Sequence, residues 1–321
     1  MQNSVASFVT EGPATRVAMT TLDPTVAAVV RQQTGVAWSR ARGLCAEGRV
    51  TVNGERCLDA ASRVPPGATV VVDQQAPKLR AGPLAKSAIV FADGSVVVVD
   101  KPAGMLSVAD EAGNRDTLAN HARTLLRGLG HGVDGKLGVV HRLDKETSGL
   151  MVFARTATAQ RALAAQFRAH DTERVYHAIA HGAVTSARVE TYLILDRGDG
   201  IRGSYGHFRR AKGDAPAEAK RAVTHLRPLA RLAGATLVEC RLETGRQHQI
   251  RIHLSERGHP LVGERVYLRD YGGPRIEAAR PMLHALTLGF VHPRTGERMS
   301  FHREAPEDFQ SMAESLRIAG S

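Results

Sequence analysis

The sequence predicts an α+β protein with two structured units. Its 321 residues are enough for two domains. Hydrophobic residues make up 43% of the chain, so a core can be buried and wholesale disorder is excluded. Segments with helical periodicity are interspersed with short β-strand patterns, and the chain shows no internal repeat or low-complexity tract. These features indicate a mixed globular fold.

The first predicted unit spans residues 22–75 and follows a tail at 1–21. Ser39 is expected to cap its second helix, and Asn53-Gly54 is a strong signal for a hairpin turn. Residues 76–86 mix Pro, Gly and Lys, which is typical of a linker. The regular segments of this unit are helices at Thr25–Gln33 and Ser39–Cys45, and strands at Arg49–Glu55 and Val70–Asp73.

The second predicted unit spans residues 87–321. It begins with a hairpin, Ala88–Val99, folded at Asp93-Gly94, and Asp116 is expected to cap a helix that ends near Gly128. The further predicted strands are Leu150–Ala154, Val175–Ala180, Ala235–Leu242, Leu283–Val291 and Met299–His302. The further predicted helices are Thr156–His170, Gln247–Arg257 and Asp308–Ile318.

Charge and cysteine usage narrow the class of protein. Lys and Arg total 43 against 32 Asp and Glu, a net charge of +11 that favours a polyanionic partner. The cysteines, Cys45, Cys57 and Cys240, are odd in number and fit neither a zinc ribbon nor a disulfide framework. We expect them to be reduced in a cytoplasmic protein. The chain has no apolar run of about 18 residues and no secretory apolar segment in its first 20, so no membrane association is expected.

The segment His141–Leu150 concentrates polar residues between two apolar strands. Asp144 lies in it, flanked by Arg142 and Lys145. A loop held by a rigid scaffold is where catalytic groups tend to lie. The alternative is an Asp that makes only a turn hydrogen bond.

A second polar segment, Leu242–His253, predicts a short helix. Ile250 and Leu254 would bury one face, and Arg251 points about 100° away from Ile250. The alternative is an ordinary basic amphipathic helix. His248 and His253 are five residues apart, which is not the spacing of a helical metal pair, so no metal site is expected.

On the strand Val175–Ala180, Tyr176 shares a face with Ala178 and Ala180. A tyrosine between alanines can present its ring to a stacked base. A buried core tyrosine is the alternative interpretation.

These segments resemble the RluA-type family of RNA pseudouridine synthases. His141–Leu150 matches the family loop H-R-L-D-x-x-T-S-G-L at every fixed position, Lys101–Gly104 matches the first motif, and Leu242–His253 matches the third, T-G-R-x-H-Q-I-R-x-H. Gly258-His259-Pro260 and Leu283-His284-Ala285 also fit, and the resemblance covers about 88–312. Residues 22–75 resemble the S4-type RNA-binding module. There are three departures: Glu264 replaces the usual Asp after Gly263, Arg174 replaces a common Lys, and Thr21 replaces the usual first Arg of the module. None of these is expected to touch the chemistry.

The resemblance implies a mixed, mainly antiparallel sheet of the pseudouridine synthase type, with a small N-terminal α/β S4-like module. It implies that Asp144 is the catalytic aspartate, that Tyr176 packs on the target base, and that Arg251 pairs with the aspartate. The reaction isomerises uridine to pseudouridine within RNA, so no cofactor is expected. Other residues expected to bind substrate are His141, Arg142, Thr147, Arg246, His248 and Ile252 in the cleft, and Arg40, Arg42 and Arg49 on the module.

The expected partner is RNA, with large-subunit ribosomal RNA favoured and transfer RNA as the alternative. We expect a monomer whose N-terminal module docks RNA independently of the chemistry. Two rival classes remain. An RNA-binding assembly factor without catalysis predicts loss of the carboxylate, but Asp144 is present. A metal-dependent nuclease or hydrolase predicts clustered ligands, which the spacing of the 14 histidines does not provide.

Overall fold

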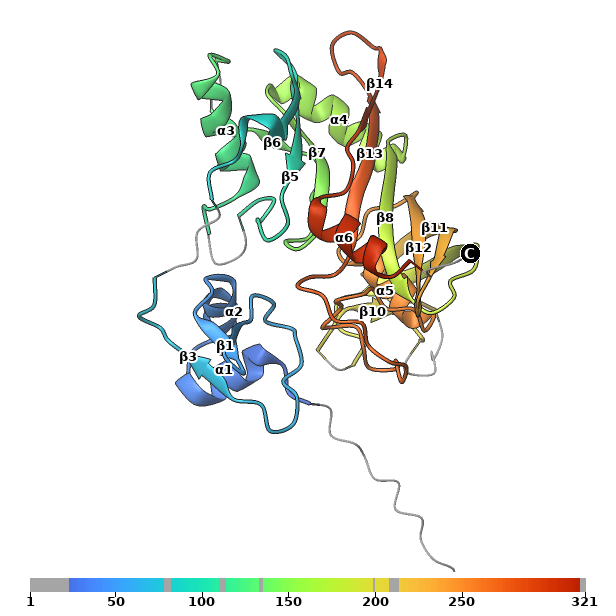
Figure 1. The fold of residues 1–321 in the computed structure, drawn as a ribbon. Coiled ribbons are helices and arrows are strands. Elements are labelled where there is room, and N and C mark those ends of the chain that lie inside the picture. The colour runs from blue at the N-terminus through green and yellow to red at the C-terminus, as the bar shows by residue number, and fades with distance from the viewer. Residues whose placement is uncertain are drawn as a thin grey trace, which may run out of the picture.

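The computed structural model describes residues 23–77, 82–109, 114–132, 135–198, 200–207 and 214–317. Figure 1 shows a small N-terminal module in blue and a larger unit built on a long, curved sheet. The predicted tail, Thr21, residues 78–81 of the predicted linker and Ile318 lie outside the described residues. No helix in the described ranges is long and apolar enough to cross a membrane.

The module packs two helices, α1 (Val26–Thr34) and α2 (Trp38–Ala46), on a three-stranded antiparallel sheet. The strands are β1 (Val50–Val52), β2 (Glu55–Arg56) and β3 (Val70–Val72). Thr25 caps α1 by accepting a hydrogen bond from the amide of Ala28. The prediction that Ser39 caps α2 is wrong. The helix begins at Trp38, so Ser39 lies inside it, and the N-cap residue, Ala37, makes no side-chain hydrogen bond.

The larger unit contains an eleven-stranded sheet. Its main path runs β10-β9-β11-β12-β8-β13-β7-β5-β4, with β14 beside β13 and β6 beside β7. The pair β7–β13 is parallel, and the other pairs of named strands in the described residues are antiparallel. The prediction of a mixed, mainly antiparallel sheet is therefore confirmed. The strands are β4 (Ile89–Ala92), β5 (Val96–Lys101), β6 (Gly138–Val139), β7 (Ser148–Ala154), β8 (Glu173–His181), β9 (Ala187–Ile194), β10 (Gly203–Ser204), β11 (Lys220–Leu232), β12 (Ala235–Leu242), β13 (Leu283–Val291) and β14 (Arg298–His302).

Three strands, β9, β10 and β11, were not predicted from the sequence. β11 is 13 residues long but contains Pro228, which argues against a strand in sequence reasoning. In the structure, the part of β11 that pairs with β9 is limited to Lys220–Leu226. Pro228 therefore lies where β11 pairs on one side only, with β12, and a register shift between Pro228 and Ala230 accommodates it.

The helices of the larger unit lie around this sheet (Figure 1). They are a short 3₁₀ turn, η1 (Lys86–Ala88), and the α-helices α3 (Leu118–Gly128), α4 (Ala157–Ala169), α5 (Gln249–Glu256) and α6 (Glu307–Ser315). Thr156 caps α4 as the predicted start implied. Thr117, not the expected Asp116, caps α3 by accepting from the amide of Asn120.

Gly149 allows the parallel strands β7 and β13 to approach each other beside the Asp144 loop. Its φ is +109°, a backbone conformation that residues other than glycine rarely adopt. Gly149 pairs directly with Ala285 of β13. A Cβ at this position would overlap the backbone oxygen of Ala285. The sheet therefore depends on glycine here for both conformation and space.

We predict that Gly149→Ala destabilises the protein by about 2–5 kcal/mol, because backbone strain and overpacking add together. Gly94→Ala is the matched control, since an added Cβ there meets nothing within 4 Å. It should change stability by about 1 kcal/mol or less. Urea unfolding of both variants measures the difference, and similar midpoints for the two would contradict the prediction.

Candidate active site

A cavity of about 450 Å³ lies where the Asp144 loop, β8 and the start of α5 meet. This volume falls within the range of small-molecule sites. Its lining brings together residues from three separate sequence motifs. The predicted site residues that line it are His141, Arg142, Asp144, Thr147, Tyr176, Arg246, His248 and Arg251. Ile252 and the module residues Arg40, Arg42 and Arg49 are not in its lining.

The backbone on both sides of Asp144 is fixed by hydrogen bonds from a distant segment. Ser107 Oγ donates to the carbonyl of Leu143 (2.7 Å) and accepts from its amide (3.1 Å). The carbonyl of Lys145 accepts from Lys101 Nζ (2.8 Å) and from the amide of Gly104 (2.9 Å). The position of the Asp144 carboxylate is therefore set by peptide groups held on either side of it.

Lys101 explains what the first motif does in this structure. Its side chain is fully buried and donates to the carbonyls of Pro102, Met105 and Lys145 at 2.8–2.9 Å. Burial lowers the pKa of Lys101 to about 7, and the negative charges of Glu146 and Asp144 oppose that shift. Sequence reasoning identified this motif but assigned no role to its lysine.

Asp144 itself is largely buried, with 17% of its side chain exposed, and His248 Nε2 lies 3.8 Å from its Oδ1. His248 Nδ1 lies 2.7 Å from the Tyr267 hydroxyl. Burial lowers the pKa of His248, so its imidazole is neutral at neutral pH, although Asp144 opposes this shift. Because burial also raises the pKa of Tyr267, the phenol keeps its proton and can donate it to Nδ1. In the tautomer with its proton on Nε2, His248 directs that proton toward Asp144.

His248 is held in this place by an unusual backbone conformation. It has φ +59° at the N-cap of α5 and makes no side-chain capping bond. A left-handed residue other than glycine is maintained only where its surroundings determine it, and such residues cluster at functional sites.

Arg251 does not form the expected ion pair with Asp144. Its guanidinium makes a bidentate pair with Glu264, with Nε–Oε2 at 2.8 Å and Nη2–Oε1 at 2.7 Å. Both side chains are buried, and the charge of Glu264 keeps the pKa of Arg251 raised despite its burial. Asp144 exerts only a weaker electrostatic effect on it. Glu264, which was not expected to touch the chemistry, is therefore the direct partner of a predicted site residue.

Tyr176 is both a core residue and a residue of the cavity lining. It pairs with Cys240 of β12 and Ala285 of β13, is 8% exposed and belongs to the main core cluster. It also lines the cavity with Asp144. Burial raises its pKa to about 12, so the phenol is neutral at physiological pH.

Of two other residues expected to bind substrate, Ile252 lies outside the cavity lining and His141 lies within it. Ile252 is fully buried against β9, β11 and Tyr267, and Ile250 lines the cavity instead, because residues two apart on a helix point in nearly opposite directions. His141 lines the cavity but accepts a hydrogen bond from the amide of Val152, and its ring stacks on Phe167 at 4.5 Å. Burial lowers its pKa to about 3, so it is a neutral support for the cavity wall.

The basic residues predicted on the module are partly engaged by an acidic neighbour. Arg40 Nη1 and Arg49 Nη1 lie 3.2 and 3.3 Å from the carboxylate of Glu47. The side chain of Arg49 is only 14% exposed, whereas Arg40 and Arg42 lie on the surface of α2. Arg40 and Arg42 are therefore better placed than Arg49 to contact phosphates.

The RNA pseudouridylate synthase family profile matches residues 95–256, and the S4 domain profile matches residues 29–70. The chain belongs to the RNA pseudouridylate synthase family. It is 42% identical over 241 residues to the ribosomal large subunit pseudouridine synthase D of Zymomonas mobilis, covering 72% of this chain and 73% of that protein. It is 37% identical over 296 residues to the protein of the same name from Pseudomonas aeruginosa, covering 87% of each.

Human RNA pseudouridylate synthase domain containing 4 has the same fold as the larger unit. The two superpose with a TM-score of 0.60 at 23% identity, covering 72% of this chain and 93% of the human one. The chain is thus an RNA pseudouridine synthase of the RluA type with an S4 domain, as the motifs predicted.

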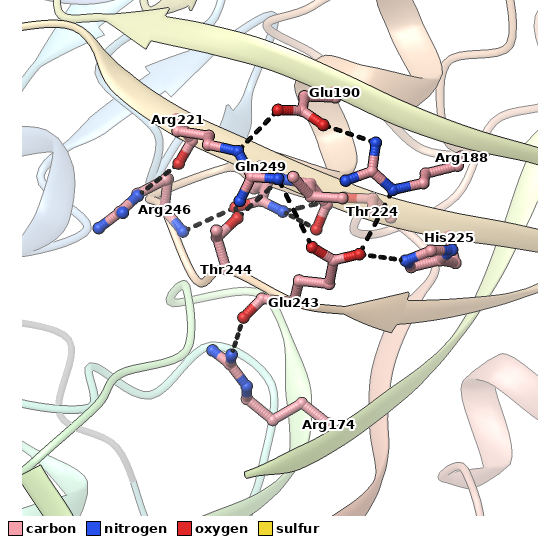
Figure 2. A network of polar contacts seen from close by, with 11 residues as sticks. Arg174, Arg188, Glu190, Arg221, Thr224, His225, Glu243, Thr244, Arg246 and Gln249 are labelled. Carbon is pink, nitrogen blue, oxygen red and sulfur yellow. Dashed lines mark hydrogen bonds and ion pairs between the residues drawn. The ribbon is translucent and has the colours of Figure 1, made fainter. Parts of the chain in front are cut away.

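In this synthase, the loop before α5 is held by a polar network on the strands that the sequence did not predict (Figure 2). Gln249 Nε2 donates to Val223 O and Thr224 Oγ1 of β11, and its Oε1 accepts from Thr244 Oγ1 and the amide of Arg246. These bonds are 2.8–3.0 Å long. β11 therefore orients the residues that lead into His248 and Arg251.

A second part of this network joins the cavity rim to the outer strands. Arg174 Nη2 donates to the carbonyl of Glu243 (Figure 2). The Oε1 atom of Glu243 lies 2.6 Å from His225 Nε2 and accepts from Arg188 Nε at 3.4 Å. Arg246 Nε donates to the carbonyl of Arg221. Two of the arginines that line the cavity, Arg174 and Arg246, are thus fixed in direction.

The His, Cys, Asp and Glu side chains of the described residues form no group of three or more that is placed to hold a metal ion. Near the cavity, His248 faces the carboxylate of Asp144, and the carboxylate of Glu264 pairs with Arg251.

We predict that Glu264→Gln destabilises the synthase by about 3–5 kcal/mol, because it leaves the buried Arg251 charge without its bidentate partner. Glu277 is an exposed carboxylate that lines a surface pocket together with Glu264, and the control Glu277→Gln should change stability by about 0.5 kcal/mol or less. Urea unfolding compares the two. Equal midpoints would show that Arg251 does not depend on Glu264.

Proposed function

We propose that this synthase converts uridine to pseudouridine in large-subunit ribosomal RNA, with Asp144 as the catalytic carboxylate. Two relatives that match most of the chain are named for that substrate. The observation that carries the assignment of the residue is the position of Asp144, on a pinned loop in a cavity lined by Tyr176, His248 and Arg251.

The carboxylate of Asp144 has two chemical routes to breaking the N-glycosidic bond. It can attack the anomeric carbon of the ribose, or it can assist the loss of uracil as that carbon gains positive character. Both routes need an ionised and fixed carboxylate. His248 Nε2 lies 3.8 Å from the carboxylate, Arg251 lines the same cavity, and the bonds to Leu143 and Lys145 fix the place of Asp144.

The freed uracil must rotate within the cavity before its carbon 5 bonds to the sugar. Tyr176, Ile250 and Leu283 provide an apolar wall for this rotation. A flat aromatic surface retains the base by stacking and imposes little barrier to rotation in its plane.

The uridine must leave its stacked position to reach Asp144, which costs a few kcal/mol and is least costly in loops and bulges. Arg142 and Arg246 are exposed at the cavity and can contact the phosphates on either side of the flipped nucleotide. The S4 domain adds Arg40 and Arg42 as further cations.

We predict that Asp144→Asn abolishes pseudouridine formation and leaves RNA binding largely intact, because the change is nearly isosteric and removes only the charge. The test maps pseudouridines in ribosomal and transfer RNA from cells lacking the protein, complemented with wild type, Asp144→Asn or the exposed control Asp171→Asn. Wild type and Asp171→Asn should restore sites in large-subunit RNA. Restoration by Asp144→Asn would disprove the catalytic role, and restoration only in transfer RNA would disprove the substrate.

We predict that Tyr176→Phe keeps RNA binding, whereas Tyr176→Leu weakens retention of the base, since stacking is worth about 1–3 kcal/mol per base. Binding titrations and single-turnover rates on a ribosomal RNA fragment separate the two effects. A Phe variant that binds normally but turns over slowly would assign the phenol a part in proton transfer at carbon 5. Near-wild-type rates for both variants would make Tyr176 a core residue only.

A further inference from the structure

The N-terminal module is in contact with the residues that surround Arg251. Lys145, next to Asp144, donates from Nζ to the carbonyl of Ala46 at the end of α2 (3.2 Å). Asp59 Oδ2 lies 3.9 Å from Arg251 Nη2. Ala61 packs against the cluster that contains Ile252 and Tyr267. The module thus contacts residues next to Asp144 and Arg251, although none of its described residues lines the cavity.

Asp59 is held so that one of its oxygens faces Arg251. Its Oδ1 accepts a hydrogen bond from the amide of Ala61 (2.9 Å), and its carbonyl accepts from Cys57 Sγ (3.3 Å). These bonds close a short turn and leave Oδ2 directed at the guanidinium. The side chain is 35% exposed, so it is partly shielded from solvent.

A small gap of about 80 Å³ separates the two parts at this point. It is lined by Arg56, Leu58 and Asp59 of the module, together with residues of the larger unit that include Glu146, Arg251 and Arg280. Residues 58–62 of the module therefore lie across a small gap from the Arg251 guanidinium.

We propose that Asp59 is a positioning residue for Arg251, and that the S4 domain thereby completes the active site as well as binding RNA. This inference rests on the proposed function of the cavity. Arg251 is held by Glu264 along its Nε–Nη2 edge, and Asp59 supplies a second negative charge at Nη2. With two carboxylates behind it, the guanidinium keeps one orientation toward the cavity and Asp144.

This proposal is an alternative to the expectation that the module docks RNA independently of the chemistry. RNA that holds the module against the larger unit also holds Asp59 against Arg251. Docking of RNA and the arrangement of the active site are therefore linked through one ion pair across the domain boundary.

Two substitutions in the full-length protein separate the charge of Asp59 from its turn. Asp59→Asn keeps an oxygen to accept from Ala61 and removes the charge. Asp59→Glu keeps the charge but cannot make the same turn. We expect Asp59→Asn to lower the single-turnover rate at saturating ribosomal RNA roughly two- to fivefold, the effect of one partly exposed ion pair. Its RNA affinity should stay within about twofold of wild type, and Asp59→Glu should recover most of the rate.

Asp73→Asn is the matched control. Asp73 lies on the same module, and its Oδ1 accepts from the amide two residues on, Gln75, as Asp59 accepts from Ala61. It should leave both rate and affinity unchanged.

The inference is overturned if Asp59→Asn turns over at the wild-type rate, or if Asp59→Glu is slow while Asp59→Asn is normal, because the turn alone would then matter. It is also overturned if Asp59→Asn weakens binding without changing the saturating rate. Absence of turnover by the wild-type protein on ribosomal RNA would instead count against the proposed function, so the two failures are distinguishable.

Discussion

The burial of one positive charge, on Arg251, organises much of the active site. A buried guanidinium is costly unless it is paired and hydrogen-bonded, and Glu264 meets that need with two short bonds. Glu264 in turn accepts from the amides of Arg265 and Val266, which fixes the loop leading to Tyr267. Tyr267 then reaches His248, and His248 faces Asp144. The predicted catalytic carboxylate is thus connected to the buried arginine through a continuous series of polar contacts.

A second constraint is the fixing of the backbone around Asp144. The side chain of Lys101 is buried and donates to three carbonyls, one of which belongs to Lys145. Removing a lysine ammonium from water is unfavourable, so its three bonds must compensate. The compensation couples the first motif to the loop of the second. Arg251 and Lys101 are thus both buried in positions where they orient a neighbouring group. Stability alone does not require buried basic side chains at these positions.

The outer strands show how distant elements support the site. β11 and β12 carry the polar network that holds Thr244, Arg246 and Gln249 (Figure 2). Sequence patterns overlooked β11 because it contains Pro228 and because many of its residues are polar or exposed. The available signal was in β9, the strand that pairs with β11. Residues along β9 alternate between partly buried and exposed, as expected of a strand with one face in solvent. The active-site loop is bound by backbone groups of Arg221 and Val223 and by the Thr224 hydroxyl, contacts that no sequence pattern reveals.

The sequence by itself determined the α+β class, most helices and the three motifs, because hydrophobic periodicity and turn residues act over a few neighbouring positions. It also identified Asp144, Tyr176 and His248 as members of one site, through their match to a family of motifs. Only the tertiary structure decided the partner of Arg251, the exchange of Ile252 for Ile250 in the cavity, and the contact of Asp59 with the active site. Each of these depends on which side chains from distant segments meet in space, and pairing between buried charges is set by packing geometry rather than by local sequence.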